Sequence, residues 1–99
     1  MTTTRKQILA LLAEHRLELT ARFGVKRLGL FGSAARDELR DDSDIDLLVQ
    51  FEGMATFDGY FGLKDRLEAL LGRQVDLVTE QGLKPRVRRN VQKDLVGVA

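Results

Sequence analysis

Two aspartates, Asp44 and Asp46, stand two residues apart in the segment DSDIDLLVQF, and this spacing could support metal chemistry. Side chains alternate along a β-strand, so both carboxylates would project from one face while Ile45 and Leu47 pack on the other. Two carboxylates directed at one point repel each other unless a cation lies between them. Oxygen ligands of this kind suit Mg²⁺, which completes its coordination with water and substrate phosphates. We therefore predict that Asp44 and Asp46 bind Mg²⁺.

A candidate phosphate-binding turn precedes this pair. Gly32 and Ser33 directly follow the short apolar segment VKRLGLF. Glycine lets a ligand approach the backbone closely, and a hydroxyl at the start of a helix, beside free N–H groups, favours an anion. A phosphate site and a metal-binding pair on neighbouring strands together predict a site for a metal-bound nucleoside triphosphate.

A third carboxylate, Asp76, lies between the apolar Val75 and Leu77 in the alternating segment QVDLV. If this strand lies beside the one that carries Asp46, Asp76 faces the same side. We expect Asp76 to share a second metal ion and to accept the proton of an attacking hydroxyl. Two metal ions stabilise both the attacking and the leaving oxygen of an in-line displacement. The predicted catalytic and metal-binding residues are therefore Asp44, Asp46 and Asp76.

Each of these features also has an ordinary structural explanation. A Gly-Ser pair after a strand is common in turns, an acidic run is usually a solvated loop, and Asp76 could simply face water. An EF-hand loop is excluded, because its spacing would put Leu47 where glycine is required and Gly53 where the bidentate glutamate belongs. The combination favours a functional site, since an unpaired carboxylate such as Asp46 is costly to bury inside an apolar strand.

Helices and strands that must position these residues alternate along the chain. Sequence patterns predict helices over about 4–23, 33–40 and 57–71 and from Pro85 onward, with strands over 25–31, from 44, and over 74–78. We predict one domain over residues 1–99, of the α/β (α+β) class, with a mixed sheet of at least three strands flanked by helices. In the 57–71 helix we expect Phe57, Tyr60 and Phe61 to take part in helix packing, with contact to a partner as the alternative.

Composition excludes several classes of protein. The formal net charge is +1, there is no cysteine, and no apolar segment approaches membrane-spanning length. These features exclude disulfides and thiolate metal sites, and the absence of a signal-peptide pattern makes the cytoplasm the default location. The basic segment KPRVRRNVQKDL is most simply a solvated amphipathic helix, with nucleotide contact, docking to an acidic partner and weak RNA binding as alternatives. The near-zero charge argues against dedicated nucleic-acid recognition.

The motifs GSAAR, from Gly32, and DSDIDLLV, from Asp42, followed by a lone aspartate on a later strand, resemble the nucleotidyltransferase superfamily with the DNA polymerase β-like fold. On so short a chain they are most similar to the minimal nucleotidyltransferases, the MNT proteins usually encoded beside a HEPN-domain partner. The resemblance covers essentially the whole chain. It implies an antitoxin that transfers AMP from ATP to a tyrosine of a HEPN ribonuclease toxin and so silences the toxin.

Matched by position, the resemblance implies metal binding by Asp44 and Asp46, a third acid at Asp76, and nucleotide binding by four residues: Gly32, Ser33, Arg36 and Ser43. Asp37 departs from the pattern, because glycine is common there in the family. We expect this aspartate to add negative charge near the phosphates and to lengthen the short helix.

The first hypothesis is therefore a Mg²⁺-dependent nucleotidyltransferase, with two Mg²⁺ ions and ATP as the substrate. Its expected partner is a HEPN-domain toxin, with which it could form a hetero-oligomer. The second hypothesis is a non-catalytic antitoxin that neutralises the toxin by binding and masking it. A third, transfer to a small molecule such as an aminoglycoside, ordinarily requires an added substrate domain that 99 residues cannot contain.

Overall fold

A four-stranded mixed sheet with five α-helices makes up the computed structural model, which describes residues 4–98. The elements, in chain order, are α1 (Arg5–Glu14), α2 (Arg16–Phe23), β1 (Val25–Phe31), α3 (Gly32–Ala35), β2 (Ile45–Phe51), α4 (Phe57–Leu71), β3 (Val75–Thr79), the 3-10 helix η1 (Glu80–Gly82), α5 (Pro85–Asp94) and β4 (Val96–Gly97). The class and the mixed sheet agree with the prediction. The predicted domain ends, residues 1 and 99, lie outside the described residues.

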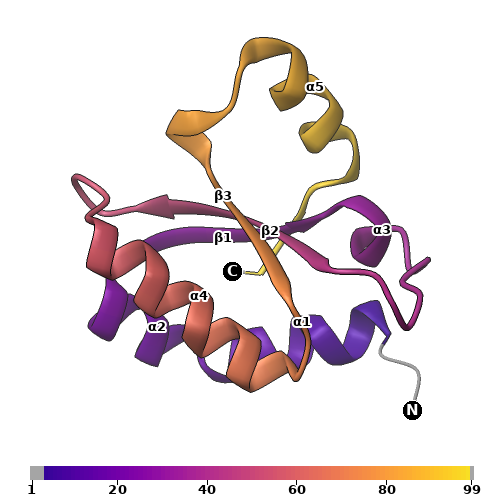
Figure 1. The fold of residues 1–99 in the computed structure, drawn as a ribbon, viewed down its shortest axis with the longest axis horizontal. Helices are drawn as coiled ribbons and strands as arrows, with labels where there is room; N and C mark the ends of the chain where they lie inside the picture. Colours follow the sequence, from indigo (N-terminus) through magenta and orange to yellow (C-terminus); the bar gives the residue numbers. More distant parts are fainter. Residues whose placement is uncertain (1–3, 99) are drawn as a thin grey trace.

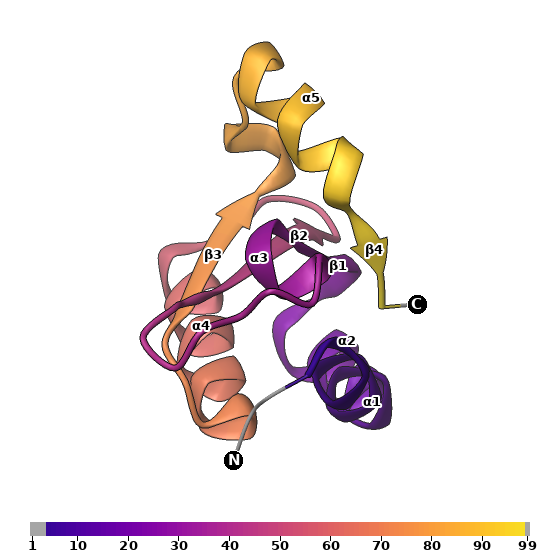
Figure 2. The same cartoon turned by 90° about the vertical axis from the view of Figure 1, so that its right-hand side faces the viewer.

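The sheet has the strand order β3-β2-β1-β4. β1 pairs antiparallel with both β2 and β4, whereas β2 pairs parallel with β3. Helices α1, α2 and α4 lie together on one side of the sheet, and α5 lies on the other side (Figures 1 and 2). The sheet therefore has one face closed by three helices and a second, more open face beneath α5.

Alternation along β2 decides which side chains face each layer. Ile45, Leu47 and Val49 are fully buried on the side of the three helices, where they meet apolar residues of those helices such as Leu12 and Leu63. Because side chains alternate, Asp46 and the other even-numbered residues of β2 point to the open face. The core thus fixes the direction of the acidic side chains.

Several helices begin and end where the sequence patterns predicted. Thr4 and Gln7 form a capping box at the start of α1, and the left-handed glycines Gly24 and Gly72 end α2 and α4. Pro85 occupies the first turn of α5 as expected. The helix predicted over 4–23 is instead two helices, because the backbone at His15 leaves the helical range with φ −101° and ψ 10°.

The short helix after β1 is the main local correction. It ends at Ala35 rather than near residue 40, and Phe31, not Ser33, occupies its N-cap position. Asp37 has a φ of 60°, a left-handed conformation that stops a helix. The prediction that Asp37 lengthens this helix is therefore wrong, and the left-handed backbone explains why glycine suits the position.

The predicted packing of two aromatic side chains in α4 is also wrong. Phe57 is 81% exposed and Phe61 46% exposed, with their ring centroids 5.1 Å apart. Tyr60 does pack against the core, and its hydroxyl donates a hydrogen bond to the Leu77 carbonyl. The structure also contains η1 and β4, which the sequence patterns did not predict.

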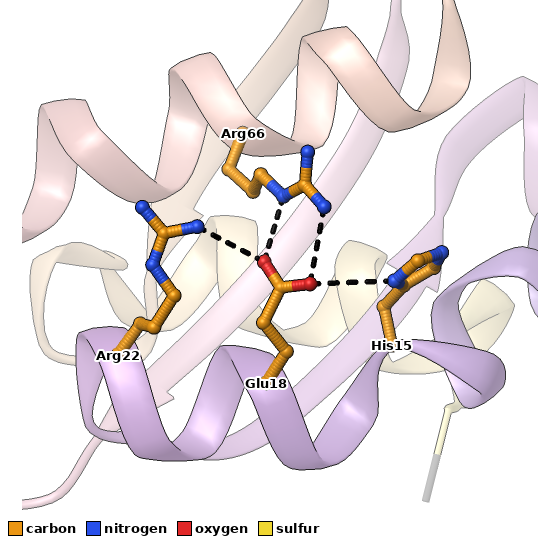
Figure 3. A network of polar contacts seen from close by, with 4 residues as sticks. All are labelled: His15, Glu18, Arg22 and Arg66. Carbon is orange, nitrogen blue, oxygen red and sulfur yellow. Dashed lines mark hydrogen bonds and ion pairs between the residues drawn. The ribbon is translucent and has the colours of Figure 1, made fainter.

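A network of ion pairs joins α2 to α4 on the closed side of the sheet (Figure 3). Arg66 donates two hydrogen bonds to Glu18, at 2.7 and 3.1 Å, and Arg22 and His15 also contact this carboxylate. The hydrogen bonding to Arg66 lowers the pKa of Glu18 to about 2. Glu18 therefore stays ionised at every physiological pH. Within residues 4–98, no helix is both long and apolar enough to cross a membrane.

Candidate active site

Asp46 lies at the centre of the candidate site, on β2, between the neighbouring strands β1 and β3. Its Cα pairs with Phe31 across the antiparallel β1 and with Asp76 across the parallel β3. Residues directly opposite in adjacent strands share a face, so Asp46 and Asp76 lie side by side on the open face. Asp44 precedes the first residue of β2 and is exposed, as is Asp76, whereas Asp46 is half-buried. The structure thus supports the sequence-based idea that Asp76 faces the same side as the pair.

The environment of Asp46 opposes its ionisation. Burial is the largest effect, followed by repulsion from the neighbouring carboxylates of Asp76 and Asp44, and together they raise its pKa to about 6. Arg36 acts in the opposite direction but does not balance the other effects. Asp44, Asp46 and Asp76, which we call the acidic row, therefore hold more negative charge than the nearby side chains neutralise.

The possible metal ligands in the acidic row are all carboxylate oxygens, which suit a hard divalent cation such as Mg²⁺. A bound cation would also relieve the repulsion that raises the pKa of Asp46. Within residues 4–98, no group of three acidic or histidine side chains already converges as a metal-binding cluster. The residues fit Mg²⁺ in chemistry and in charge, with Asp44, Asp46 and Asp76 as the available ligands.

Gly32 contacts Asp46 directly at the start of α3. Its φ is 71°, and a Cβ atom built there would overlap the Oδ2 atom of Asp46. Any side chain at this position would thus meet both a strained backbone and a steric collision. The glycine was predicted because it would let a ligand approach, and the structure adds that it makes room for the acidic side chain itself.

Ser33 lies half-buried in the first turn of α3, beside the acidic row. Its carbonyl accepts a hydrogen bond from the Glu38 N–H at 2.8 Å, whereas its hydroxyl makes no hydrogen bond to any residue between 4 and 98. The hydroxyl is therefore available to an incoming ligand.

Arg36, predicted to bind the nucleotide, is held by two carboxylates in the structure. Its Nη1 donates to Asp94 at 2.7 Å, and its Nε donates to Glu38 at 3.3 Å. The hydrogen bond to Asp94 is the larger cause of a raised Arg36 pKa. Asp94 ends α5, so this ion pair fastens α5 to the end of α3. No sequence signal connected Asp94 with the site.

Ser43 organises the loop that leads into Asp44. Its Oγ accepts a hydrogen bond from the Arg40 N–H, and its own N–H donates to the Arg40 carbonyl at 3.0 Å. Arg73, from the segment between α4 and β3, donates to the carbonyls of both Arg40 and Ser43. The loop before Asp44 is therefore clamped by an arginine that sequence reasoning did not identify.

Asp37 is paired with the start of α1. Its Oδ1 accepts a hydrogen bond of 2.9 Å from the backbone N–H of Arg5, at the first turn of α1. There its charge meets the positive end of a helix dipole. The carboxylate thus has a structural role that the sequence did not predict, and the charge it adds near the phosphates stays a prediction.

Comparisons with known proteins agree with this geometry. Residues 12–98 match the family model of the nucleotidyltransferase domain. The protein adenylyltransferase MntA of Thermococcus cleftensis is 42% identical over 95 residues, which cover 96% of each protein. A solved structure described as a minimal nucleotidyltransferase is 45% identical, with a TM-score of 0.81 over 95% of each chain.

A more distant likeness is one of fold alone. A structure of a tri-AMPylated HEPN toxin from Shewanella oneidensis in complex with an MNT antitoxin contains a chain that is 19% identical. It aligns with a TM-score of 0.66 over 92% of this chain and 71% of that one.

Proposed function

Because the chain belongs to the nucleotidyltransferase domain family, and within it to the minimal nucleotidyltransferases, we propose that it transfers AMP from ATP to a tyrosine hydroxyl of a HEPN-domain toxin. This modification would silence the toxin, so the protein would act as its antitoxin. The observation that carries the proposal is the in-register pair of Asp46 and Asp76 on one face of the sheet, with Asp44 two residues before.

Mg²⁺ would be held by Asp44, Asp46 and Asp76, and when bound it supplies positive charge that stabilises the phosphate oxygens during displacement. Gly32 and Ser33 would receive the triphosphate at the start of α3. Their position beside Asp46 supports this role, because Gly32 lies against that carboxylate.

The proposed reaction is an in-line displacement at the α-phosphorus of ATP. The tyrosine oxygen forms a bond to this phosphorus while the bond to the bridging oxygen of pyrophosphate breaks, and pyrophosphate leaves. Asp76 accepts the proton of the tyrosine hydroxyl, a role for which its exposed position on β3 suits it. Arg36 and Ser43 would act on the nucleotide side of the site. Arg36 lies close enough to lower the pKa of Asp46, and the Ser43 carbonyl is held by Arg73.

The proposed partner is a HEPN toxin, because the MNT chain of similar fold in the Shewanella oneidensis structure is in complex with one. We place the reaction in the cytoplasm, where ATP and Mg²⁺ are abundant. A second candidate function, masking of the toxin without catalysis, is favoured by one observation: the exposed Phe57 and Phe61 offer an apolar contact surface.

The test is transfer of label from ATP, labelled in the α-phosphate, to the co-expressed neighbouring HEPN protein in the presence of Mg²⁺. Three proteins are compared: the wild type, the Asp44→Asn, Asp46→Asn double variant, and the control Asp65→Asn, which changes an exposed acid on α4. We expect equal labelling with the wild type and the control, and none with the double variant.

A stable complex without label would contradict the enzymatic proposal and favour masking. Labelling that survives in the double variant would also contradict the proposal, because the acidic row would then be dispensable. A tyrosine-to-phenylalanine scan of the labelled protein identifies the acceptor. Label on a residue other than tyrosine would contradict that part of the proposal.

A further inference from the structure

The face of the sheet that carries the acidic row continues beyond it as two further rows of side chains. The pairing places Gly29, Leu48 and Val78 in the next row, and Arg27 opposite Gln50 in the row after that. Consecutive rows on one face are about 7 Å apart, because they are separated by two residues along each strand. The surface beneath α5 is therefore continuous with the proposed active site.

A cavity of about 320 Å³ lies over these two rows and beneath α5. Its apolar lining includes Leu48 and Gly29 of the sheet, Val91 of α5, and Leu95, which directly follows α5. Charged residues also border it: Arg27, Glu80 and Arg88. A Cβ atom at Gly29 would collide with the Leu95 side chain, so the glycine allows the sheet and Leu95 to approach this closely. The volume is at the lower end of the roughly 300–1,000 Å³ typical of small-molecule sites, and the lining combines apolar side chains with polar ones.

Two side-chain amides, Gln50 and Gln92, border the same cavity. Neither amide makes a hydrogen bond to another residue in the part of the chain from 4 to 98. A carboxamide carries both a donor and an acceptor, which match the adjacent amino group and ring nitrogen of adenine. The cavity therefore offers apolar lining together with two amides, the half-buried Gln50 and the exposed Gln92, whose donors and acceptors suit a base edge.

We propose that this cavity binds the adenine base of the nucleotide, with Gln50 as a specificity-determining residue. The inference rests on the proposed function, because it takes the α-phosphate to lie at Asp46 and Asp76. The cavity begins one row from Asp46, and the ribose of a nucleotide links the α-phosphate to the base over a separation of this order. A tyrosine side chain fits less well, because its single hydroxyl must reach Asp76 and its ring has no group that pairs with either amide.

The experiment is calorimetric titration of the whole protein in Mg²⁺ with three ligands: ATP, CTP and inorganic tripolyphosphate. The variants are Gln50→Leu, which removes the amide while keeping an apolar side chain of similar size, and the control Gln81→Leu on η1, which does not border the cavity. For the wild type and the control we expect ATP to bind more tightly than CTP and tripolyphosphate. For Gln50→Leu we expect about tenfold weaker ATP binding, the scale of one or two lost hydrogen bonds, with tripolyphosphate unchanged.

Equal affinities of the wild type for ATP and tripolyphosphate, including no binding of either, would overturn the proposal. So would a Gln50→Leu variant that weakens both ligands equally, because that result would indicate a general structural effect. The label-transfer assay separates the two proposals. If the base site is wrong, AMP transfer still occurs and still requires Asp44 and Asp46. If only the proposed reaction is wrong, ATP selectivity persists without transfer.

Discussion

Replacing Asp46 by asparagine should stabilise the metal-free protein at neutral pH. In the folded state the pKa of Asp46 is about 6, compared with an ordinary value of 3.8, because burial and the neighbouring carboxylates oppose its charge. The difference is about two pH units, or about 3 kcal/mol at about 1.4 kcal/mol per unit. Asp46 is partly open to solvent, which screens these effects, so we expect a gain of about 1–2 kcal/mol.

The pH dependence of this gain follows from proton linkage. Below pH 3.8 Asp46 is protonated in both the folded and the unfolded chain, so its ionisation makes no difference. Between pH 3.8 and about 6 the unfolded chain releases the proton while the folded protein retains it, so the wild type loses stability as the pH rises. The asparagine side chain of the variant cannot ionise. The stability advantage of the variant should therefore grow across this window and remain constant above it.

The assay is urea unfolding of both proteins in EDTA at pH values from 4 to 8, with Asp65→Asn as the control for loss of a surface charge. A gain of this size corresponds to a rise in melting temperature of roughly 5–10 °C for a domain of this length. Adding Mg²⁺ should stabilise the wild type more than the variant, because the variant lacks one carboxylate ligand. The reasoning would be refuted by a variant that is less stable than the wild type at pH 7.5, or by a difference that does not vary with pH.

Three further predictions concern the surroundings of the site. Gly32→Ala should lower the free energy of unfolding, measured in urea, by well over 1 kcal/mol, because backbone strain and the collision with the Asp46 carboxylate add to each other. The control Gly53→Ala has a similar φ of 73° but no atom within 4 Å of the added Cβ, so it should lower the free energy of unfolding by only about 1 kcal/mol. In the wild type, the ionised Glu18 loses its stabilising effect as the pH falls from about 4.5 to about 2, because its pKa is lowered in the folded state. Glu18→Gln should abolish this pH-dependent loss of stability, which a series of unfolding curves across that pH range measures. Arg73→Ala should free the loop before the acidic row and raise the Mg²⁺ concentration needed for half-maximal AMP transfer, with a smaller effect on the circular dichroism spectrum. An unchanged Mg²⁺ requirement would contradict the positioning role of Arg73.

The local elements were predictable because their signals are local. The capping box at Thr4, the glycines that end α2 and α4, and the alternation in β2 and β3 each depend on residues a few positions apart. The position of Asp76 beside Asp46 was a conditional prediction, because the sequence does not say which strand neighbours β2. The parallel pairing of β2 with β3 supplies that information.

Contacts between distant segments could not be predicted in the same way. Arg36 and Asp94 are 58 residues apart, and Arg73 is 30 residues from the Ser43 carbonyl that it holds. Neither pair has a spacing signal, since tertiary packing alone brings them together. The error at Phe57 and Phe61 has a related cause: helical periodicity identifies an apolar face but does not say which turns of the helix the sheet covers.

The location of Asp76 on β3 has a consequence for how activity is lost. β3 is an edge strand of five residues, paired only with β2 within the sheet. Because β3 has a neighbour on one side alone, we expect it to open at a lower free energy than the central strands β1 and β2. A molecule in that state keeps both sequence motifs and most of its core, but it has lost the proposed proton acceptor. Heat or a protease should therefore inactivate the protein before a global probe such as circular dichroism reports unfolding.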